Sequence, residues 1–258
     1  MSIPFYKKDD SDHNNWYTKF KYVCMAPAAV LRFCGLIISF STTYLLEIVP
    51  NSYDIVASVT PYMFLLSLGV YPTEIKNKHL INHGIKNNAI MVYNHVSIAD
   101  VFVIFLLHQF AIVINSTYGT LFKHIINNSD GIIIEKKPNQ TDKIIEHVRA
   151  KKRCLIIAPE GQVTNGTFLA PFKLGAFAPL HPVQPILLRY KYNYCNPFFS
   201  EDHPCIVLYR MLTQFITFVS VEVLPVMYPL TNETPAEFAD RVRTIMAYEL
   251  PAQKYKLI

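Results

Sequence analysis

Residues 89–108, AIMVYNHVSIADVFVIFLLH, join two apolar runs through a short polar turn. Residues 89–93 have the length and composition of a buried β-strand, and residues 99–108 have helical length and spacing. The segment therefore predicts one strand–turn–helix unit, which is the building block of an α/β fold.

The same alternation continues along the chain from residue 76. Short apolar runs predict further strands at residues 111–114, 132–134, 154–158, 183–188 and 217–224. Longer or amphipathic segments predict helices at residues 118–126, 141–150, 205–215 and 235–250. Continuous apolar strands separated by helices are typical of a mostly parallel sheet covered by helices, so we expect that α/β fold class. Pro185 predicts an edge or bulge position for the strand that contains it.

Two apolar stretches precede this region, at residues 23–49 and 55–71. The second would span about 26 Å as a helix, against a hydrocarbon core of about 30 Å. We expect a membrane-associated helical hairpin that lies in one leaflet or spans the bilayer with a tilt. A pair of buried helices in a soluble protein is the alternative. The predicted division is a polar segment at 1–22, the hairpin at 23–72 and the α/β domain at 73–258.

The composition is consistent with lipid contact. The chain has 258 residues, of which 51% are hydrophobic and 17% are charged, whereas soluble domains carry roughly 25% charged residues. The net charge of +5 comes without a long basic run or a nucleic-acid motif, so we expect no nucleic-acid partner. The five cysteines lack metal-like spacing and indicate a reducing compartment, and we expect no metal site.

His95 directly follows the strand predicted at residues 89–93, and Asp100 comes five residues later. On one continuous helix their side chains would point about 140° apart. They can meet if His95 lies in the turn and Asp100 in the first helical turn, and the capping-box pattern of Ser97 and Asp100 favours that break. A carboxylate fixes one tautomer of an imidazole and leaves the other nitrogen as a base. The pattern predicts a catalytic pair whose substrate supplies the hydroxyl; a helix-capping Asp100 beside an ordinary His95 is the alternative.

Polar residues also follow two other predicted strands. Glu160, Gly161 and Thr164 follow the strand at residues 154–158, and Lys173 lies further along the same connection. Lys136 follows the strand at residues 132–134. Lysines and glycine-rich loops can bind a phosphate or ester group, and ordinary solvated loops are the alternative.

One pair of histidines has a spacing found in metal sites. His79 and His83 are four residues apart, but no acidic or cysteine ligand lies nearby in the sequence. We therefore predict an exposed pair and not a metal site.

Four blocks, taken in order, resemble the glycerolipid acyltransferase family, which includes 1-acylglycerol-3-phosphate and lysophospholipid acyltransferases. Residues 94–100, NHVSIAD, resemble its N-H-x-x-x-x-D block, and residues 131–136 resemble its G-x-x-F-I-D-R block. Residues 160–166 resemble its E-G-T-R-S block, and residues 183–188 its apolar strand with an internal proline.

Finer similarities point to the lysophosphatidylcholine and lysophosphatidylethanolamine acyltransferase branch, at residues 164–166, 172–177, 183–185, 188–190 and 221–226. Two positions depart from the family pattern. Val163 stands where the third block often has arginine, and Lys136 stands where the second has arginine. The first departure argues against a bare phosphomonoester acceptor such as lysophosphatidate.

The resemblance implies an acyl-CoA-dependent O-acyltransferase that acylates a lysophospholipid of the phosphatidylcholine or phosphatidylethanolamine type. His95 would be the general base and Asp100 would orient it. The residues implied to bind substrate are Lys136, Glu160, Gly161, Thr164 and Lys173. Acyl-CoA would be a co-substrate, with no separate cofactor. The alternatives are a glycerol-3-phosphate or 1-acylglycerol-3-phosphate acyltransferase and an inactive membrane lipid-binding protein.

The resemblance and the unpaired cysteines also imply a location. We expect a protein of the endoplasmic reticulum membrane whose catalytic domain faces the cytosol, with membrane lipid as a partner. The N-glycosylation sequons are then expected to be unused; they begin at Asn115, Asn127, Asn139, Asn165 and Asn232. The sequence does not indicate an oligomeric state.

Overall fold

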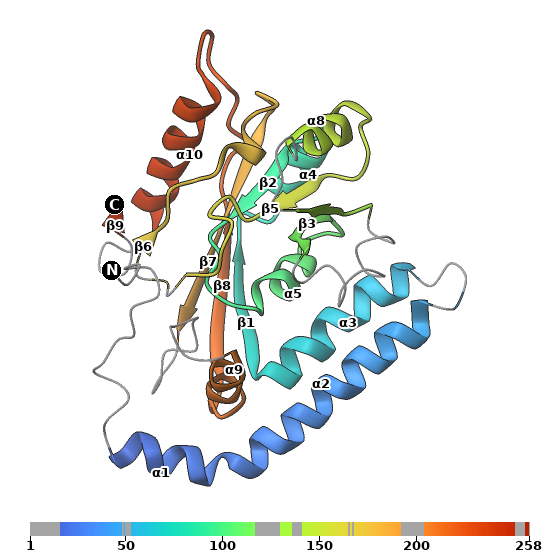
Figure 1. The fold of residues 1–258 in the computed structure, drawn as a ribbon, viewed down its shortest axis with the longest axis vertical. Coiled ribbons are helices and arrows are strands. Elements are labelled where there is room, and N and C mark those ends of the chain that lie inside the picture. The colour runs from blue at the N-terminus through green and yellow to red at the C-terminus, as the bar shows by residue number, and fades with distance from the viewer. Residues whose placement is uncertain are drawn as a thin grey trace.

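The computed structural model describes residues 16–47, 49, 53–116, 130–135, 141–164, 166, 168–191, 204–250 and 256–257. A seven-stranded sheet forms the centre of the fold, with strand order β1-β8-β7-β2-β5-β3-β4 (Figure 1). Its strands are β1 (Val70–Lys76), β2 (Ile90–Tyr93), β3 (Ala111–Asn115), β4 (Ile132–Ile134), β5 (Leu155–Ile157), β7 (Val183–Lys191) and β8 (Thr217–Val223). A separate two-stranded sheet pairs β6 (Phe168–Leu169) with β9 (Lys256–Leu257).

The strand directions confirm the expected mostly parallel sheet. Strands β7, β2, β5, β3 and β4 run parallel to one another. Strand β8 is antiparallel to β7, and β1 at the edge is parallel to β8. The C-terminal ends of β2 and β5 therefore emerge side by side, which brings the segments that follow them together.

Helices cover both faces of the sheet. The described helices are α1 (Trp16–Cys24), α2 (Ala26–Glu47), α3 (Tyr53–Leu68), α4 (Leu80–Lys86), α5 (Asp100–Phe105), α8 (Thr141–Arg149), the 3₁₀ turn η3 (Leu174–Ala176), α9 (Pro204–Leu212) and α10 (Pro235–Glu249). Side chains of β2 alternate between two buried clusters, as a pleated strand requires. Met91 and Tyr93 pack in the cluster that includes residues of α3 and α5, whereas Ile90 and Val92 pack in the cluster that includes residues of α8 and α10.

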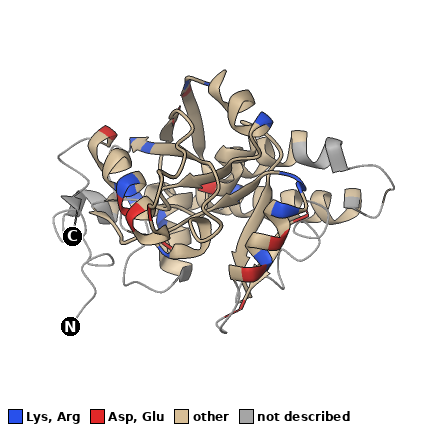
Figure 2. Ribbon diagram, turned by 90° about the horizontal axis from the view of Figure 1, so that it is seen from above, with Lys and Arg blue, Asp and Glu red and all other residues tan. Residues whose placement is uncertain are grey.

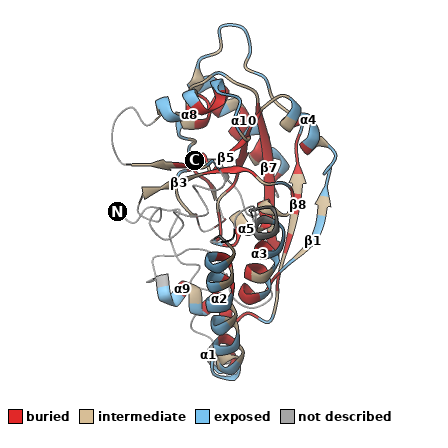
Figure 3. Cartoon of the chain, turned by 90° about the vertical axis from the view of Figure 1, so that its right-hand side faces the viewer, coloured by how far each residue is buried: buried red, intermediate tan, exposed pale blue. Residues whose placement is uncertain are grey.

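The hairpin of α2 and α3 packs on one side of this sheet, with α3 between α2 and α5 (Figure 1). Small residues allow the two helices to approach closely, since a Cβ added at Gly35 would lie 2.7 Å from the Ser67 hydroxyl. Phe64 of α3 stacks on Phe102 of α5 with ring centroids 4.2 Å apart. The outer helix α2 remains largely exposed (Figure 3). Its residues 26–46 are long and apolar enough to cross a membrane, with a mean hydropathy of 1.6.

Several elements differ from the sequence-based expectations. Strand β1 and helix α4 were not predicted, and α1 occupies part of the segment that was expected only to be polar. Strand β1 begins at Val70, so the sheet starts before the predicted domain boundary at residue 73. The helix predicted at residues 118–126 lies outside the described residues.

Pro185 was expected at an edge or bulge, but it lies in β7, a central strand between β8 and β2. The sheet tolerates it because Pro185 lies where the β7–β8 ladder ends, one residue before the Ile186–Val223 pair. Its carbonyl still accepts a hydrogen bond from the Leu224 N–H over 2.9 Å. An N–H at residue 185 would also have pointed toward the β8 side, at a position past the last residue pair of the β7–β8 ladder.

Candidate active site

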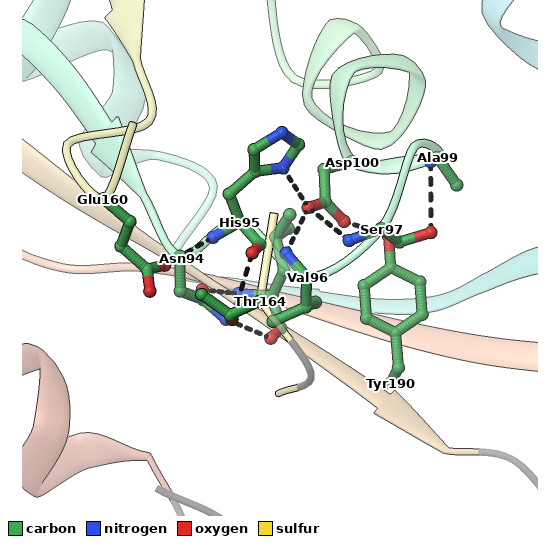
Figure 4. A network of polar contacts seen from close by, with 10 residues as sticks. Asn94, His95, Val96, Ser97, Ala99, Asp100, Glu160, Thr164 and Tyr190 are labelled. Atoms are coloured by element: carbon green, nitrogen blue, oxygen red, sulfur yellow. Dashed lines mark hydrogen bonds and ion pairs between the residues drawn. The ribbon is translucent and has the colours of Figure 1, made fainter. Parts of the chain in front are cut away.

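The predicted pair meets at the C-terminal end of β2. The Nδ1 atom of His95 lies 2.9 Å from Oδ2 of Asp100 (Figure 4). His95 lies in the turn and Asp100 is the first residue of α5, which is the arrangement that their spacing required. Asp100 is fully buried, whereas 19% of the His95 side chain remains exposed. The imidazole can therefore be reached from outside, and the carboxylate cannot.

Four donors surround the Asp100 carboxylate. Oδ2 accepts the backbone N–H groups of Val96 at 2.8 Å and Ser97 at 3.0 Å, besides facing His95. Oδ1 accepts the hydroxyl of Tyr190 at 2.5 Å. Because the Asp100 carboxylate accepts backbone N–H bonds, it is also the acceptor toward the imidazole of His95. In the neutral ring, Nδ1 therefore carries the hydrogen and Nε2 keeps a lone pair. This is the tautomer that a general base needs.

The capping box predicted from Ser97 and Asp100 forms only in part. The carboxylate of Asp100 accepts the Ser97 N–H, as in a capping box. The Ser97 hydroxyl instead accepts the N–H of Ala99 at 3.2 Å, because a tight turn precedes the helix. Asp100 thus both starts α5 and contacts His95, which unites the two alternatives considered for it.

Asn94 fixes the start of this turn, a contribution that the sequence reasoning missed. Its side-chain amide donates to the Leu188 carbonyl at 3.0 Å and its Oδ1 accepts the Leu188 N–H at 2.8 Å. The side chain therefore replaces one backbone pairing between β2 and β7. Its place in the N-H-x-x-x-x-D block was the only signal in the sequence.

Glu160 braces the backbone of His95. Oε1 accepts the His95 N–H at 2.8 Å, and Oε2 accepts the Ala170 N–H at 2.9 Å. Only 2% of the residue is exposed. The pKa of Glu160 is raised to about 8, chiefly by burial and also by the charge of Asp100, although the two N–H donors and Arg243 favour the ionised form.

Thr164 holds the same residue from the other side. Its N–H and its hydroxyl both donate to the His95 carbonyl, over 2.8 and 3.2 Å, and the residue is fully buried. Glu160 and Thr164 were expected to bind substrate. The structure instead buries both against His95, with their polar atoms bonded inside the protein, so neither presents a surface to a ligand.

Two of the other expected substrate-binding residues lie together and exposed. Gly161 has a φ of +67°, which favours glycine, and a Cβ built there would lie 2.5 Å from the Lys173 ammonium. Lys173 therefore extends over Gly161, and its N–H donates to the Pro159 carbonyl at 2.8 Å. The fifth residue, Lys136, lies outside the described residues.

Tyr93 places a second ring beside the histidine, with centroids 5.5 Å apart. Burial raises the pKa of Tyr93 above its usual range, and the charges of Asp100 and Glu160 raise it further. The hydroxyl therefore stays protonated and does not compete with His95 as a base. Among the described residues, no group of three or more His, Cys, Asp or Glu side chains could hold a metal ion.

A family model matches the part of the chain that holds this site. Residues 72–188 match the model described as Acyltransferase, and they include His95 and Asp100. The matched region also contains the Glu160 segment and most of β7.

Proteins similar to the chain include lysophospholipid acyltransferases. The chain is 33% identical over 148 residues, 54% of its length, to lysophospholipid acyltransferase LPEAT2 of Arabidopsis thaliana. It is 34% identical over 141 residues, 50% of its length, to lysophosphatidylcholine acyltransferase of Drosophila melanogaster. It is 33% identical over 147 residues, 52% of its length, to human lysophosphatidylcholine acyltransferase 1. These matches cover 28%, 26% and 26% of the respective relatives' lengths.

A solved structure shares the fold of almost the whole chain. The 1-acyl-sn-glycerophosphate acyltransferase PlsC from Thermotoga maritima superposes with a TM-score of 0.68, covering 88% of this chain and 94% of PlsC. The sequence identity is 13%, so the likeness shows a common fold.

Proposed function

We propose that this chain is a membrane-bound acyltransferase that transfers a fatty acyl group from acyl-CoA to a lysophospholipid hydroxyl. The favoured acceptors are lysophosphatidylcholine and lysophosphatidylethanolamine. The observation that carries the proposal is the 2.9 Å contact between His95 and a fully buried Asp100, within the region that matches the Acyltransferase family model. The similarity to lysophospholipid acyltransferases supports the choice of acceptor.

In the proposed reaction, Nε2 of His95 takes the proton of the acceptor hydroxyl as that oxygen attacks the thioester carbonyl. Asp100 stabilises the imidazolium through the Nδ1 hydrogen bond. An ester C–O bond forms and the thioester C–S bond breaks, and the proton passes from His95 to the departing coenzyme A thiolate. General-base catalysis of this kind contributes about 10²–10⁴-fold to the rate.

The surrounding residues divide into two groups in this proposal. Glu160 and Thr164 hold the backbone of His95 and so aim its ring, which follows from their bonds to its N–H and carbonyl. Lys173, lying over Gly161, supplies positive charge for a substrate phosphate, with Lys136 as a second candidate. No metal or separate cofactor takes part.

Membrane attachment is part of the proposal, since both substrates carry acyl chains. The apolar helix α2 is long enough to enter a bilayer. We place the domain on the cytosolic side of the endoplasmic reticulum, because Cys24, Cys34 and Cys154 are free thiols and acyl-CoA is a cytosolic substrate. The sequons are then unmodified, and a mass loss on endoglycosidase treatment would contradict this orientation.

The catalytic pair can be tested with three variants. We expect His95→Ala and Asp100→Asn each to lose at least about 10²-fold in acyl-CoA-dependent acylation of lysolipid in liposomes. His83→Ala, which removes an exposed histidine of α4, is the matched control and retains the wild-type rate. A wild-type rate in the His95 or Asp100 variant would remove that residue from the mechanism.

A matrix of acceptors and acyl-CoA donors tests the substrate. Lysophosphatidylcholine and lysophosphatidylethanolamine are expected to be the best acceptors. Faster turnover of lysophosphatidate or glycerol-3-phosphate would assign the chain to those activities instead. Binding of lysolipid without turnover of any pair would identify an inactive lipid-binding protein. Activity is expected to survive treatment with a chelator.

A further inference from the structure

An exposed apolar surface continues from α2 onto helix α9 and the turn after it. Phe215 in this turn is 69% exposed, and Leu31 on the neighbouring α2 is 74% exposed. The other large exposed hydrophobic residues of this corner are Phe20, Val23, Val30, Phe33, Ile206 and Tyr209. Helix α9 lies beside α1 and α2 in both side views (Figures 1 and 3). We refer to these residues, together with Leu31 and Phe215, as the α2–α9 corner.

Arg32 connects the two parts of the corner. Its guanidinium donates to the carbonyls of Leu212 at 2.9 Å and Phe215 at 2.8 Å, and also to the carbonyl of Gln214. These carbonyls lie at and just beyond the C-terminus of α9, where helical carbonyls lack intrahelical partners. Gly69, at a φ of +68°, leaves room for the guanidinium, because a Cβ there would lie 2.6 Å from its central carbon.

This arrangement suits a lipid environment. A segment in hydrocarbon must satisfy its backbone polar groups inside the protein, and an arginine at that depth pairs with partners such as backbone carbonyls. Arg32 meets both requirements with one set of bonds. The charge of Arg32 and these carbonyls are thus paired with each other next to the surface that Leu31 and Phe215 present.

A second set of contacts, made by amphipathic residues, joins α1 to α9 and the turn after it. The ammonium of Lys21 donates to the side chain of Gln214 at 3.1 Å, and the hydroxyl of Tyr209 donates to the Tyr22 carbonyl at 3.0 Å. The rings of Tyr22 and Tyr209 lie 5.9 Å apart. Tyrosine and lysine are typical of the boundary between lipid headgroups and acyl chains.

Position along α2 sets the depth of Phe215. Arg32 is the seventh residue of α2, about 9 Å from its start, and lies inside the apolar segment at residues 26–46. If residues 26–46 lie in lipid, either parallel to the membrane surface or across the bilayer, the groups bonded to Arg32 lie in lipid as well. Lys and Arg (blue) and Asp and Glu (red) occupy a minority of the ribbon that the structure describes (Figure 2).

We propose that α9 and Phe215 form a second lipid-contacting element, seated in the bilayer beside α2 and held there by Arg32. The occupant of this surface is membrane lipid. The inference rests on the membrane attachment proposed above and goes beyond it, because it brings α9 and the turn after it to the bilayer as well as the N-terminal helices.

Single-tryptophan variants in vesicles test the proposal. The sequence contains one tryptophan, Trp16, which is replaced by phenylalanine in every variant. Tryptophan is then introduced by Leu31→Trp in α2, Phe215→Trp after α9, or Tyr248→Trp on the exposed surface of α10. The proteins are reconstituted into phosphatidylcholine vesicles with or without brominated acyl chains, which quench tryptophan on contact.

We expect brominated lipid to lower the fluorescence of Leu31→Trp and Phe215→Trp by about twofold and to leave Tyr248→Trp unchanged. Ile206→Trp gives a second reporter in α9 should Phe215→Trp fold poorly. Quenching at residue 31 without quenching at residues 206 and 215 would overturn the α9 contact and leave the attachment of α2 standing. An absence of quenching at residues 31, 206 and 215 would overturn the lipid contact of both α2 and α9. Quenching at residue 248 equal to that at residues 31 and 215 would overturn both contacts too.

Discussion

The hydroxyl of Tyr190 donates to Oδ1 of Asp100 over 2.5 Å, although the two residues are 90 positions apart in the sequence. Tyr190 lies in β7 and Asp100 begins α5, so the bond ties the central sheet to the turn that holds His95. Both residues are buried. In the proposed mechanism Tyr190 is a positioning residue, because it acts on the base through Asp100.

Tyr190→Phe removes this donor and preserves the ring. We expect kcat to fall by about 10–100-fold with KM unchanged, because a hydrogen bond to a charged group contributes about 1.5–3 kcal/mol. Steady-state kinetics with lysophospholipid as the varied substrate measures kcat and KM separately. Tyr248→Phe, at an exposed position, is the control; an unchanged kcat in Tyr190→Phe, or a rise in KM without a fall in kcat, would contradict the role.

Glu160 predicts a pH dependence of stability. Burial raises its pKa to about 8 from an ordinary 4.5, so the folded protein holds a proton that the unfolded chain releases between these values. The contribution of Glu160 to the free energy of unfolding should therefore be largest below about pH 4.5. It should fall as pH rises through 8, by on the order of a few kcal/mol.

Glu160→Gln isolates this effect, because the amide does not titrate and can still accept the His95 N–H. Denaturant unfolding in mild detergent at about pH 5, 7 and 9 measures it. The wild type should lose stability over this range by more than the variant does. Parallel pH dependences for the two proteins would show that Glu160 is ionised throughout.

The sequence predicted the elements whose signals are local. Strand β4 was predicted at the residues that form it, and the meeting of His95 and Asp100 was predicted from their spacing together with a helix start at Ser97. Strand β1 was missed because its sequence, VYPTEIK, is largely polar, as suits an edge strand with one neighbour. Helix α4 was missed because seven residues with an internal glycine show no clear period.

The partners supplied by distant elements could not be predicted in this way. Tyr190 belongs to an apolar strand, and nothing near it in the sequence indicates that its hydroxyl reaches Asp100. Glu160 was expected to face a ligand because it leaves a strand end. Its burial depends on the Ala170 N–H, ten residues further on, and on the parallel pairing of β2 with β5. Such contacts follow from topology.

Lys173 is expected to act on substrate binding. Lys173→Met keeps the apolar stem and removes the ammonium that lies over Gly161. We expect the KM for lysophospholipid to rise by about tenfold with little change in kcat, because one charge-assisted hydrogen bond to phosphate is lost. Lys78→Met removes an exposed lysine before α4 and serves as the control. An unchanged KM for lysophospholipid in Lys173→Met would exclude a phosphate contact by this residue.

Gly84 is expected to be essential for packing α4 on the sheet. A Cβ at this position would lie 1.9 Å from Oε1 of Gln184 and 2.9 Å from the terminal carbon of Met91. Gln184 cannot yield easily, because its amide donates to the carbonyls of Leu80 and Leu224, each at 3.0 Å. Gly84→Ala should therefore lower the free energy of unfolding by about 1–3 kcal/mol, despite the better helix propensity of alanine.

The collision with Gln184 gives this prediction an internal check. Gln184→Ala removes the obstructing side chain, so Gly84→Ala should cost less stability in that background than in the wild type. Gly175→Ala is the matched control, since the nearest atom to its added Cβ is the Ile144 methyl carbon at 3.4 Å. Denaturant midpoints of the four variants in detergent provide the comparison. Additive effects of Gly84→Ala and Gln184→Ala would show that the alanine methyl is accommodated without contact with Gln184.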